Sequence, residues 1–508
     1  MTSNSKIEDL DELATVLHTL QVEGEKIVHC HGVFDLLHVG HIRYFEEARA
    51  MGDVLVVTLT QDQFVNKGPN RPAFSQELRA HAIASLEAVD YVAINRWPTS
   101  VETIQLLRPD IYVKGGEFKD ELDLDGAVSQ EAQTIRDIGG EIRFTDDTVT
   151  FSSSNLLNRY ISPFSEETIQ YLATFRQQHT LDEVLDWLER IATLKPVVVG
   201  EAIIDEYVFG VGIGKSTKDP VLAVHQQSIE AYVGGSLAIA NHLAGLCNQV
   251  ALIAQLGEND RDESFVRQGL HPHVNPVFLT KPHSPTIHKR RIVDRYSGNK
   301  LLEIYVMNAD FTTEEDEIQL CRTLENALPA HDVAVVADYG HGMLTPASID
   351  VLCRSASFLA VNVQSNAGNH GFNPVSKYRR ADYICLASYE IDIETRHRQG
   401  PVKDRIMELA ERIDCSRFTV TLGKDGSIHL EREVGFTHVP ALATRVHDRV
   451  GAGDAVLAVT SLLVHLGAPW DIVGFIGNAA GAHLVAELGN RVPLDRTVLS
   501  KQITALMK

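Results

Sequence analysis

The fold of the N-terminal part is decided by the stretch GVFDLLHVGHIRYF, residues 32–45, which follows the apolar run KIVHCHGVF. This pattern predicts a strand that turns directly into a helix. The N–H groups of a helix's first turn lack partners within the helix, and the helix dipole is positive there, so anions bind at this end. Gly32 and Gly40 permit close approach of the backbone, and His38 and His41 project from the same side of the turn. The stretch therefore predicts an anion site at a strand-to-helix junction.

Three interpretations of this junction are open. In the first, His38 caps the helix and His41 is half-buried, which is common for single histidines. In the second, the two imidazoles bind a metal ion, but no third ligand is suggested and zinc sites use three or four. In the third, the junction binds phosphate, and basic or hydroxyl residues further along favour it: Lys67, Arg71, Lys114 and Ser152 to Ser154. Each basic residue could instead be a solvated surface charge, which we expect for Arg79 alone.

Short apolar strands alternate with helical segments along the chain. Such alternation predicts a parallel sheet covered by helices on both faces, so the expected fold class is α/β. At 508 residues the chain exceeds the usual size of a single core. A first series ends near Tyr160, a second begins at PVVVGEAIID, and a polar helical stretch lies between them. We expect domains at 1–162 and 196–508, joined by a helical connector at 163–195.

The C-terminal part contains a second chemical pattern, VHDRVGAGDAVLA, residues 446–458. Gly451, Ala452 and Gly453 would leave N–H groups open at a helix start, forming an anion hole, and Asp454 would face the same space as a potential base. An ordinary turn and helix cap is the alternative. Asp448, six residues before Asp454, makes that alternative less attractive.

Composition excludes several classes of function. The formal net charge of -22 disfavours binding to nucleic acids or anionic membranes, because both require basic surfaces. The six cysteines form no C-x-x-C pair, so neither a zinc knuckle nor a disulfide framework is indicated. The N-terminus lacks the features of a signal peptide, and no apolar run reaches eighteen residues. We expect a cytoplasmic protein without a membrane span.

The motif GVFDLLHVGH resembles that of the H-x-G-H nucleotidyltransferases, and residues 6–160 resemble the nucleotidyltransferase half of the bacterial ADP-heptose synthases. The runs LEAVDYVAI, LLRPDIYVKGGEF, IGGEIRF and SSSN follow in the family's order. The resemblance implies a Rossmann-like fold in which a sugar 1-phosphate attacks the α-phosphorus of a nucleoside triphosphate and expels pyrophosphate. It implies catalytic roles for His38, His41 and Lys114. The nucleotide would contact Gly32, Phe34, Asp35, Gly40, Lys67, Arg71, Ser152, Ser153 and Ser154.

The second pattern is similar to D-x-x-G-A-G-D of the ribokinase-like sugar kinases, and the chain from about Val197 onward resembles the kinase half of the same family. The resemblance implies a ribokinase-like α/β fold in which Asp454 deprotonates a sugar hydroxyl. Glu390 and Asp448 would help to organise Mg²⁺ indirectly. ATP would contact Thr421, Gly423, Gly426, Gly451, Ala452, Gly453 and Asn478. The sugar would contact Asp205, Gly234, Gly235, Asn241, Lys289, Arg291 and Asp338.

Several positions depart from the family's pattern. Ala238 and Ala387 stand where the family usually has asparagine, and His341 replaces a lysine. The polar segment NVQSNAGNHGFN, residues 362–373, replaces an Asp-Pro-Lys element. A site that hydrogen-bonds one hydroxyl rejects analogues that lack it, so changed polar groups point to a changed acceptor. Heptose 7-phosphate is the leading candidate on resemblance.

Together the two resemblances imply a bifunctional, cytoplasmic transferase with Mg²⁺ as cofactor. ATP would phosphorylate heptose 7-phosphate at its anomeric hydroxyl, and ATP, or alternatively CTP, would then supply the nucleotidyl group. The product would be ADP-heptose-like and would serve lipopolysaccharide synthesis. The expected partners are small molecules and a second copy, in a dimer formed through the kinase halves. The order of the halves is expected to be reversed relative to the family. The alternatives are a degenerate, regulatory kinase half or a different sugar or polyol acceptor.

Overall fold

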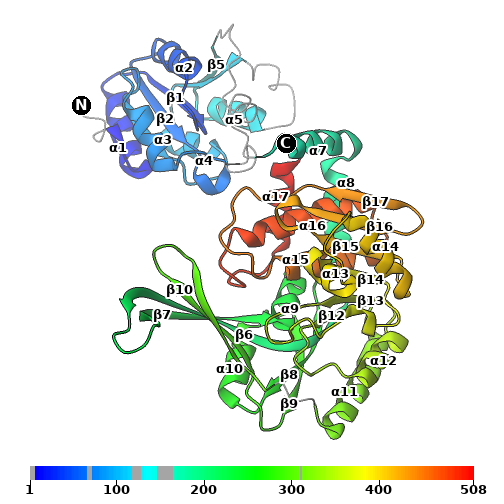
Figure 1. The fold of residues 1–508 in the computed structure, drawn as a ribbon. Helices are drawn as coiled ribbons and strands as arrows, with labels where there is room; N and C mark the ends of the chain where they lie inside the picture. The colour runs from blue at the N-terminus through cyan, green and yellow to red at the C-terminus, as the bar shows by residue number, and fades with distance from the viewer. Residues whose placement is uncertain (1–5, 66–70, 117–126, 146–163, 309–311) are drawn as a thin grey trace. The chain divides into compact units, whose positions relative to one another are not determined.

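The computed structural model describes residues 6–65, 71–116, 127–145, 164–308 and 312–508 (Figure 1). The chain divides into two compact units, Met1–Pro163 and Phe164–Met507, which we describe separately. No helix within the described ranges has both the length and the apolar character needed to cross a membrane.

The first unit is a five-stranded parallel sheet with the strand order β3-β2-β1-β4-β5. The order reverses direction between β1 and β4, and ligands of such sheets bind at the carboxyl ends of the strands beside this point. The strands are β1 (Ile27–Gly32), β2 (Val54–Leu59), β3 (Tyr91–Ile94), β4 (Ile111–Lys114) and β5 (Glu141–Phe144). The helices are α1 (Leu10–Val22), α2 (Val39–Arg49), α3 (Gln76–Ala84), α4 (Val101–Leu107) and α5 (Ala127–Asp137).

The core of the first unit lies on both faces of this sheet. Alternate residues of a strand point to opposite faces, so Val28 packs against one layer and Ile27 against the other. One layer includes Phe45 of α2, and the other includes Leu13 of α1. All of β2 is buried, as expected for a central strand covered on both sides. The expected α/β class is confirmed for this unit.

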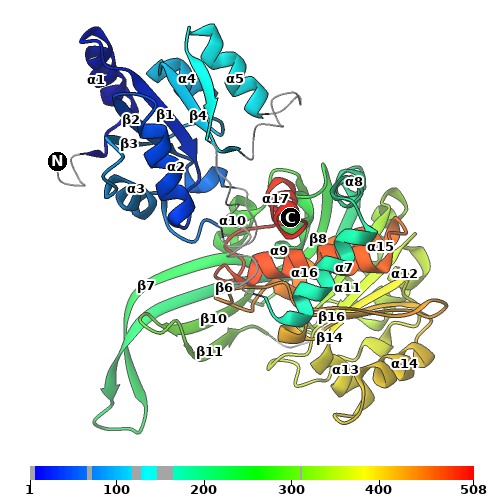
Figure 2. The ribbon, with the colours of Figure 1, turned by 90° about the horizontal axis from the view of Figure 1, so that it is seen from above.

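The second unit contains a twelve-stranded mixed sheet organised by β6, a strand of 20 residues. Its first half pairs in parallel with β8 and β12 within the body of the unit. Its second half pairs with β7 and β10, and β10 pairs with β11. We call β7, β10, β11 and the second half of β6 the extension sheet; Figure 2 shows it projecting from the body.

The strands of the second unit are β6 (Pro196–Lys215), β7 (Leu222–Gly235), β8 (Val250–Gly257), β9 (Val274–Lys281), β10 (Ile287–Asp294), β11 (Lys300–Val306), β12 (Val333–Asp338), β13 (Leu359–Val363), β14 (Tyr383–Ala387), β15 (Arg417–Thr421), β16 (Ser427–Glu431) and β17 (Gly435–Val439). Its helices are α7 (Glu166–Gln178), α8 (Leu181–Ile191), α9 (Ser236–Ala244), α10 (Asp260–Gly269), α11 (Glu314–Ala327), α12 (Pro346–Ser355), α13 (Ser388–Thr395), α14 (Val402–Arg412), α15 (Ala452–His465), α16 (Trp470–Val485) and α17 (Arg496–Leu506). These alternating elements confirm the α/β class here too.

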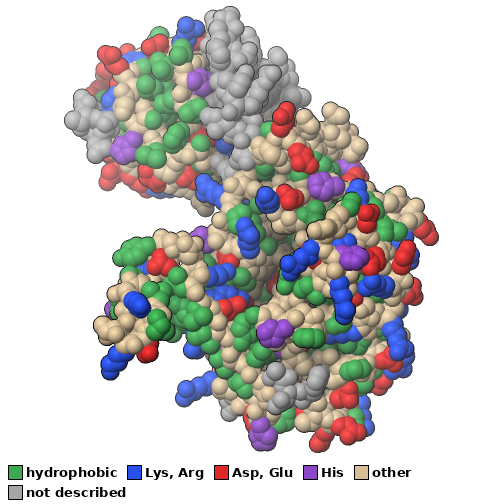
Figure 3. Space-filling view, in the orientation of Figure 1, with side chains coloured by type: hydrophobic (Ala, Val, Ile, Leu, Met, Phe, Trp, Pro, Cys, Tyr) green, Lys and Arg blue, Asp and Glu red, His purple; other side chains and the backbone are tan. Residues whose placement is uncertain are grey.

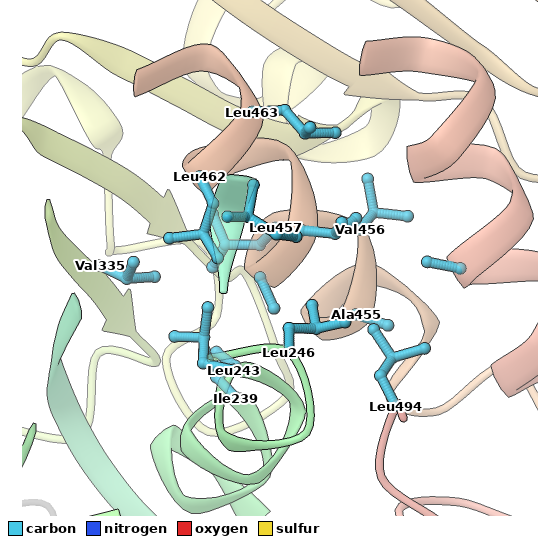
Figure 4. Close-up of a cluster of buried hydrophobic side chains, with 14 of the residues drawn as sticks. Ile239, Leu243, Leu246, Val335, Ala455, Val456, Leu457, Leu462, Leu463 and Leu494 are labelled. Carbon is cyan, nitrogen blue, oxygen red and sulfur yellow. The ribbon is translucent and has the colours of Figure 1, made fainter. Parts of the chain in front are cut away.

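Helix α15 runs through the centre of this unit's core. Every residue from Ala455 to Val464 is buried, and a helix that is apolar on all sides is one that packs on all sides. Figure 4 shows Leu457 and Leu462 among side chains from α9 and β12, including Leu243 and Val335. This packing holds the N-terminus of α15 in a fixed place.

Helices α7 and α8 occupy the segment expected to be a connector. Phe175 of α7 and Leu188 of α8 are buried in the same core as α15. The ring of Phe175 stacks on that of Phe475 with centroids 4.2 Å apart. Both helices therefore belong to the packed body of the second unit.

Candidate active sites

The end of β1 and the start of α2 form the junction that the sequence indicates. His38 is the N-cap of α2, and its Nδ1 accepts a hydrogen bond from the Gly40 N–H at 3.1 Å. Because Nδ1 accepts, the proton of a neutral His38 ring lies on Nε2. The rings of His38 and His41 stack with centroids 4.0 Å apart. Two imidazoles thus lie together at the positive end of a helix.

The loop before α2 is shaped by Gly32 and Phe34. Phe34 adopts a positive φ of 46°, and a methyl group on Gly32 would lie 2.8 Å from its ring. The Phe34 ring meets His41 edge-on at 5.4 Å and Phe45 at 5.0 Å. Phe34 is buried, so it supports His41 from below.

Asp35 joins this loop to the segment that precedes α3. Its Oδ1 accepts from the N–H groups of Ala73 at 2.7 Å and Phe74 at 3.1 Å. Its Oδ2 pairs with Arg71 Nε at 2.6 Å, and both side chains are almost fully buried. The structure therefore brings Arg71 to the junction, as the phosphate interpretation expects. Lys67 and Ser152 to Ser154 lie outside the described residues.

The expectation that Arg79 is a solvated surface charge is wrong. Its side chain is buried in α3, and its guanidinium donates to the backbone oxygens of Val33, Thr60 and Phe74. It also pairs with Asp62 Oδ1 at 2.6 Å. These carbonyls end β1 and β2 or precede α3, where no neighbouring strand supplies donors. A guanidinium with five N–H donors satisfies them together.

Lys114 lies at the carboxyl end of β4, next to β1. Its ammonium pairs with Glu131 Oε2 of α5 at 2.7 Å, and both side chains are largely buried. Glu131 Oε1 in turn accepts from the Ser100 hydroxyl at 2.5 Å. A buried cation of this kind sets the local charge at the end of the sheet.

The sequence analysis missed two further histidines on β1. His29 Nε2 and His31 Nδ1 both contact the Thr58 hydroxyl, at 2.7 and 2.8 Å. Burial, followed by the charge of Lys114, lowers the pKa of His29 to about 3 and lowers that of His31 as well. Both rings are therefore neutral at pH 7. Alternate histidines in HCHG, residues 29–32, were the available signal, since they share one face of a strand.

In the second unit, the G-A-G-D motif forms the start of α15. Gly451 is the N-cap with a φ of 85°, and a methyl group there would lie 2.2 Å from Asn490 Oδ1. Ala452 and Gly453 begin the helix, so their N–H groups belong to its open first turn. Asp454 lies in the same turn.

Asp454 has the electrostatics of a general base. Desolvation by the surrounding protein, with a further contribution from Asp205, raises its pKa to about 7. The Tyr339 hydroxyl donates to Asp454 Oδ1 at 3.2 Å and opposes this shift, as does the charge of Lys289. A carboxyl with a pKa near the operating pH combines a basic oxygen with a useful ionised fraction.

Asp205 on β6 lies near Asp454 and is held by contacts with two neighbouring side chains. Its Oδ1 accepts from Arg291 Nη1 at 2.6 Å, and its Oδ2 accepts from Asn490 Nδ2 at 3.1 Å. A methyl group on Gly234 would lie 2.1 Å from Asp205 Oδ2, so only glycine fits there. Gly235, the N-cap of α9, has a φ of 59°. The structure thus brings four of the expected sugar-site residues together.

Lys289 stands between two aromatic rings. Its Nζ lies 5.3 Å from the ring centroids of both Tyr305 and Tyr339, and the side chain is buried. Burial lowers its pKa. Within the part of the chain that the structure describes, no carboxylate forms an ion pair with it. A buried ammonium without a paired anion suits a ligand that carries negative charge.

Asp338 and Asn241, both expected in the sugar site, hydrogen-bond to other parts of the second unit. Asp338 accepts from Gly340 N–H and Asn373 Nδ2 at 3.1 Å each, and from Tyr378 hydroxyl and Lys377 Nζ at 2.7 and 2.6 Å. It therefore anchors the asparagine-rich segment. The Asn241 amide donates to the Gly269 carbonyl and accepts from the His271 N–H, at 2.8 Å each, which links α9 to the end of α10.

Three of the residues expected to contact ATP lie at or near the turn between β15 and β16. Thr421 ends β15, and Gly423 and Gly426 have positive φ angles of 64° and 89°. A methyl group on Gly426 would lie 2.1 Å from the Val439 carbonyl oxygen. Asn478 of α16 donates to that same oxygen at 3.0 Å. The turn and α16 are therefore fastened to each other at the end of β17.

Glu390 and Asp448, expected to organise Mg²⁺, have their carboxylate oxygens engaged. Glu390 accepts from the N–H groups of Ala387 and Ser365 at 2.7 and 3.2 Å, and desolvation raises its pKa to about 7. Asp448 pairs with Lys300 Nζ at 2.6 Å and accepts from the Tyr207 hydroxyl at 3.1 Å. Among the described residues, no group of three or more potential ligand side chains is placed to hold a metal ion.

Two residues of this site were missed from the sequence. Asn490 connects Asp205 with the start of α15, although no motif marks it. Glu201 on β6 accepts from the backbone N–H groups of Tyr339 and His341 at 3.0 Å each. Burial, followed by Asp338, raises the pKa of Glu201. Both act through chain segments more than 130 residues away, which a local pattern does not show.

The two units match two families of transferases. Residues 29–196 match a family described as "Cytidylyltransferase-like", and residues 193–496 match "pfkB family carbohydrate kinase". The chain is therefore a transferase that combines a nucleotidyltransferase-like unit with a sugar-kinase unit. Because the second match covers more than half of it, the chain belongs to the pfkB family of carbohydrate kinases. The matches give this order of units, but they do not support the expectation that the order is reversed.

Curated relatives and solved structures agree with this assignment. The chain is 36% identical to "Bifunctional protein HldE" of Geobacter sulfurreducens over 166 residues, which are 32% of this chain and 33% of the relative. It is 42% identical to that of Aliarcobacter butzleri over 144 residues, 27% and 30% of the two chains. The chain thus matches about a third of the length of these relatives. Phosphofructokinase-2 from Escherichia coli in complex with potassium shares the fold, with a TM-score of 0.51, 15% identity and coverage of 62% and 100%.

Proposed function

We propose that the chain makes a nucleoside-diphosphate sugar in two steps. The second unit transfers the γ-phosphoryl group of ATP to the anomeric hydroxyl of a sugar phosphate. The first unit then transfers a nucleotidyl group to the resulting sugar 1-phosphate and releases pyrophosphate. The resemblance to the ADP-heptose synthases favours heptose 7-phosphate as the acceptor and ADP-heptose as the product, and the similarity to HldE proteins extends over about a third of the chain. The domain limits that we propose are 1–162 for the first domain and, because α7 and α8 pack into the second core, 164–508 for the second rather than the expected 196–508.

The observation that carries the proposal is the arrangement of Asp454 at the start of α15. Its carboxylate takes the proton of the acceptor hydroxyl as the hydroxyl oxygen attacks the γ-phosphorus, and ADP leaves. The N–H groups of Gly451, Ala452 and Gly453 stabilise charge on the transferred group, because the first turn of a helix leaves its N–H groups without partners within the helix and its dipole is positive there. The reaction balances: one P–O bond forms, one breaks, and the proton goes to Asp454.

The acceptor side of the site is proposed to consist of Asp205 and its surroundings. Asp205 is oriented by Arg291 and Asn490, and its carboxylate oxygens have further lone pairs for sugar hydroxyls. Lys289 supplies positive charge beside it. Gly234 leaves room for the Asp205 carboxylate and Gly235 for the backbone of β6, so we propose that these two residues of β7 hold Asp205 in place beside the sugar.

In the first unit, we propose that the start of α2 holds the triphosphate. His38 and His41 face it as a stacked pair and donate to the phosphate oxygens, while Arg71 and Lys114 neutralise charge. The sugar 1-phosphate oxygen attacks the α-phosphorus directly and pyrophosphate leaves, so no covalent enzyme intermediate is needed. Catalysis then rests on positioning and charge stabilisation.

Direct coordination of Mg²⁺ by Glu390 and Asp448 does not fit their environment. Both carboxylates already accept hydrogen bonds or pair with Lys300. We therefore derive no step through a metal ion bound to them. We propose that they organise Mg²⁺ indirectly, by fixing α13 and the segment before α15.

The test measures the two steps separately. Purified full-length protein is given ATP, Mg²⁺ and heptose 7-phosphate, and ADP and pyrophosphate are followed by independent coupled assays. ATP, CTP, GTP and UTP are then compared in the second step with sugar 1-phosphate acceptors. We expect both products with ATP. Absence of both ADP and pyrophosphate across a panel of heptose phosphates, other sugars and polyols would refute the proposal.

A degenerate, regulatory kinase half is the second candidate, favoured by Ala238 and Ala387 at positions where the family carries asparagine. Asp454→Asn distinguishes the two candidates, because the side chain keeps its size but loses its basic oxygen. Loss of ADP formation with unchanged pyrophosphate release from sugar 1-phosphate supports an active kinase. If the Asn variant converts a sugar without an anomeric phosphate as fast as wild type does, the regulatory candidate is supported.

We also propose that two copies associate through their extension sheets. Hydrophobic side chains are exposed there, among them Leu222 and Ile229 of β7 and Leu302 and Ile304 of β11. Figure 3 shows hydrophobic side chains gathered over this sheet. Light scattering of wild type and Leu302→Glu tests this: a dimer that the substitution dissociates supports it, and a wild-type monomer contradicts it.

A further inference from the structure

A buried histidine in the second unit has an unsatisfied ring nitrogen that the mechanism does not use. His341 is 4% exposed, and its Nε2 has no hydrogen-bond partner among the described residues. Burying a polar atom without a partner costs free energy, so such an atom in a folded protein requires an explanation. A ligand oxygen at Nε2 would remove this cost.

The position of the ring is determined by its neighbours. The backbone N–H of His341 donates to Glu201, and Gly342 follows with a φ of 98°. A methyl group on Gly368 would lie 3.0 Å from the Cε1 atom of His341, so glycine leaves room for the ring there. Its other neighbour is the Tyr305 ring, edge-on with centroids 6.4 Å apart. The imidazole therefore has a fixed place beside β11.

The His341 imidazole lies on the same side of the kinase site as Asp454, the proposed base. The Tyr339 hydroxyl contacts Asp454, Lys289 stands between Tyr339 and Tyr305, and Tyr305 meets His341. One side of the site is thus lined, in order, by the Asp454 carboxylate, the Lys289 ammonium and the Nε2 atom of His341. An acceptor whose reacting hydroxyl lies at Asp454 would extend its distant end toward Lys289 and His341.

The charges around His341 indicate which kind of chemical group the remote end of the acceptor carries. Burial is the main cause that lowers the pKa of His341 to about 4; the charges of Lys289 and Lys281 add to this shift, and that of Asp338 opposes it. The ring is therefore neutral at pH 7, and one of its nitrogens carries a proton. With ammonium groups nearby, an anionic oxygen is favoured over a cationic or apolar substituent.

We propose that His341 is a specificity-determining residue of the kinase site, whose Nε2–H donates a hydrogen bond to an anionic oxygen at the end of the acceptor remote from the reacting hydroxyl. The inference rests on the proposed function and deepens it: the acceptor is a sugar that already carries a phosphate. His341 fixes that phosphate together with Lys289, and it takes no part in proton transfer.

The test is equilibrium binding of heptose 7-phosphate and of unphosphorylated heptose, by calorimetry without ATP, to the full-length protein. His341→Ala should weaken binding of heptose 7-phosphate by about 10- to 100-fold, the usual effect of losing a hydrogen bond to a charged group. Binding of heptose should change by less than about threefold, since it lacks the anion. His341→Gln places an amide N–H near the position of Nε2 and should restore part of the affinity.

Kinetics and controls separate this inference from the proposed function. In the ADP assay, His341→Ala should raise KM for heptose 7-phosphate with little change in kcat. His397→Ala, at an exposed histidine in the loop after α13, is the matched control and should change neither quantity. Thermal unfolding identifies a variant that fails to fold, and His341→Gln then serves in its place.

The outcomes are distinct. Wild type that binds heptose 7-phosphate without forming ADP overturns the proposed function and leaves the role of His341 standing. Wild type that forms ADP, with His341→Ala and His341→Gln binding both sugars as wild type does, overturns the role of His341 alone. Equal weakening for both sugars also overturns it, because the contact would then not be to the phosphate. Wild type that binds neither sugar overturns both.

Discussion

The raised pKa of Asp454 makes the kinase step depend on pH in a way that an ordinary aspartate would not. With a pKa of about 7, about half of the carboxyl groups are ionised at pH 7 and about a tenth at pH 6. Only the ionised form accepts the proton, so the rate of ADP formation should fall about fivefold between pH 7 and pH 6. An aspartate with the ordinary pKa of 3.8 would leave the rate unchanged over that range.

The same shift predicts an effect on stability. Folding favours the neutral form of Asp454, since its folded pKa lies above its unfolded value. The stability that this preference contributes is present below pH 4 and is lost as the pH rises through 7. Asp454→Asn is neutral at every pH, so it should unfold at a higher temperature than wild type at pH 8, and the difference should be smaller at pH 5.

The assay follows ADP formation at saturating heptose 7-phosphate from pH 5.5 to 8.5, with calorimetric melting of the same samples. Pyrophosphate release from sugar 1-phosphate is the internal control, because it does not use Asp454. A kcat that stays flat down to pH 5.5, together with an Asn variant that melts at or below the wild-type temperature at pH 8, would refute the reasoning.

Three other substitutions test the remaining contacts. In Gly234→Ala the new methyl group would lie 2.1 Å from Asp205 Oδ2 and displace it. Because about 1 Å of misplacement has a large effect on binding and rate, KM for the acceptor should rise at least tenfold. Gly212→Ala is the control, and an unchanged KM in Gly234→Ala would contradict the proposed role of Asp205. Arg79→Leu leaves three carbonyls without donors and should destabilise the first unit by about 3 kcal/mol or more by calorimetry, whereas Arg43→Leu should not. His41→Ala should lower pyrophosphate release about 100-fold with ADP formation intact; equal loss of both would indicate misfolding.

Sequence patterns alone identified the elements at which each site is built. The junction at His38 and the helix start at Gly451 lie where the motifs indicate, because a helix N-terminus depends on residues within one turn of it. The two-unit α/β organisation follows from strands and helices that alternate along the chain. The roles of individual site residues remain proposals.

Contacts between distant segments decided what the patterns could not. The sequence predicts that Arg79 is a surface charge, but in the structure it is buried against the ends of β1 and β2. Asp338 forms contacts with Asn373 and Lys377, which no local pattern predicts. Asn490 carries no motif, yet it connects Asp205 to Gly451.

The physical reason for this division is the range of the forces involved. Helix starts, turns and strand alternation depend on backbone geometry within a few residues, so the amino-acid sequence by itself determined the two classes of unit and the places where anions would bind. Burial and the pKa of a carboxyl depend on everything that surrounds it, and Asp454 meets Asp205, Lys289 and Tyr339 only after the chain has folded. Tertiary structure alone therefore decided that the pKa of Asp454, which the motif marks as a potential base, is raised to about 7.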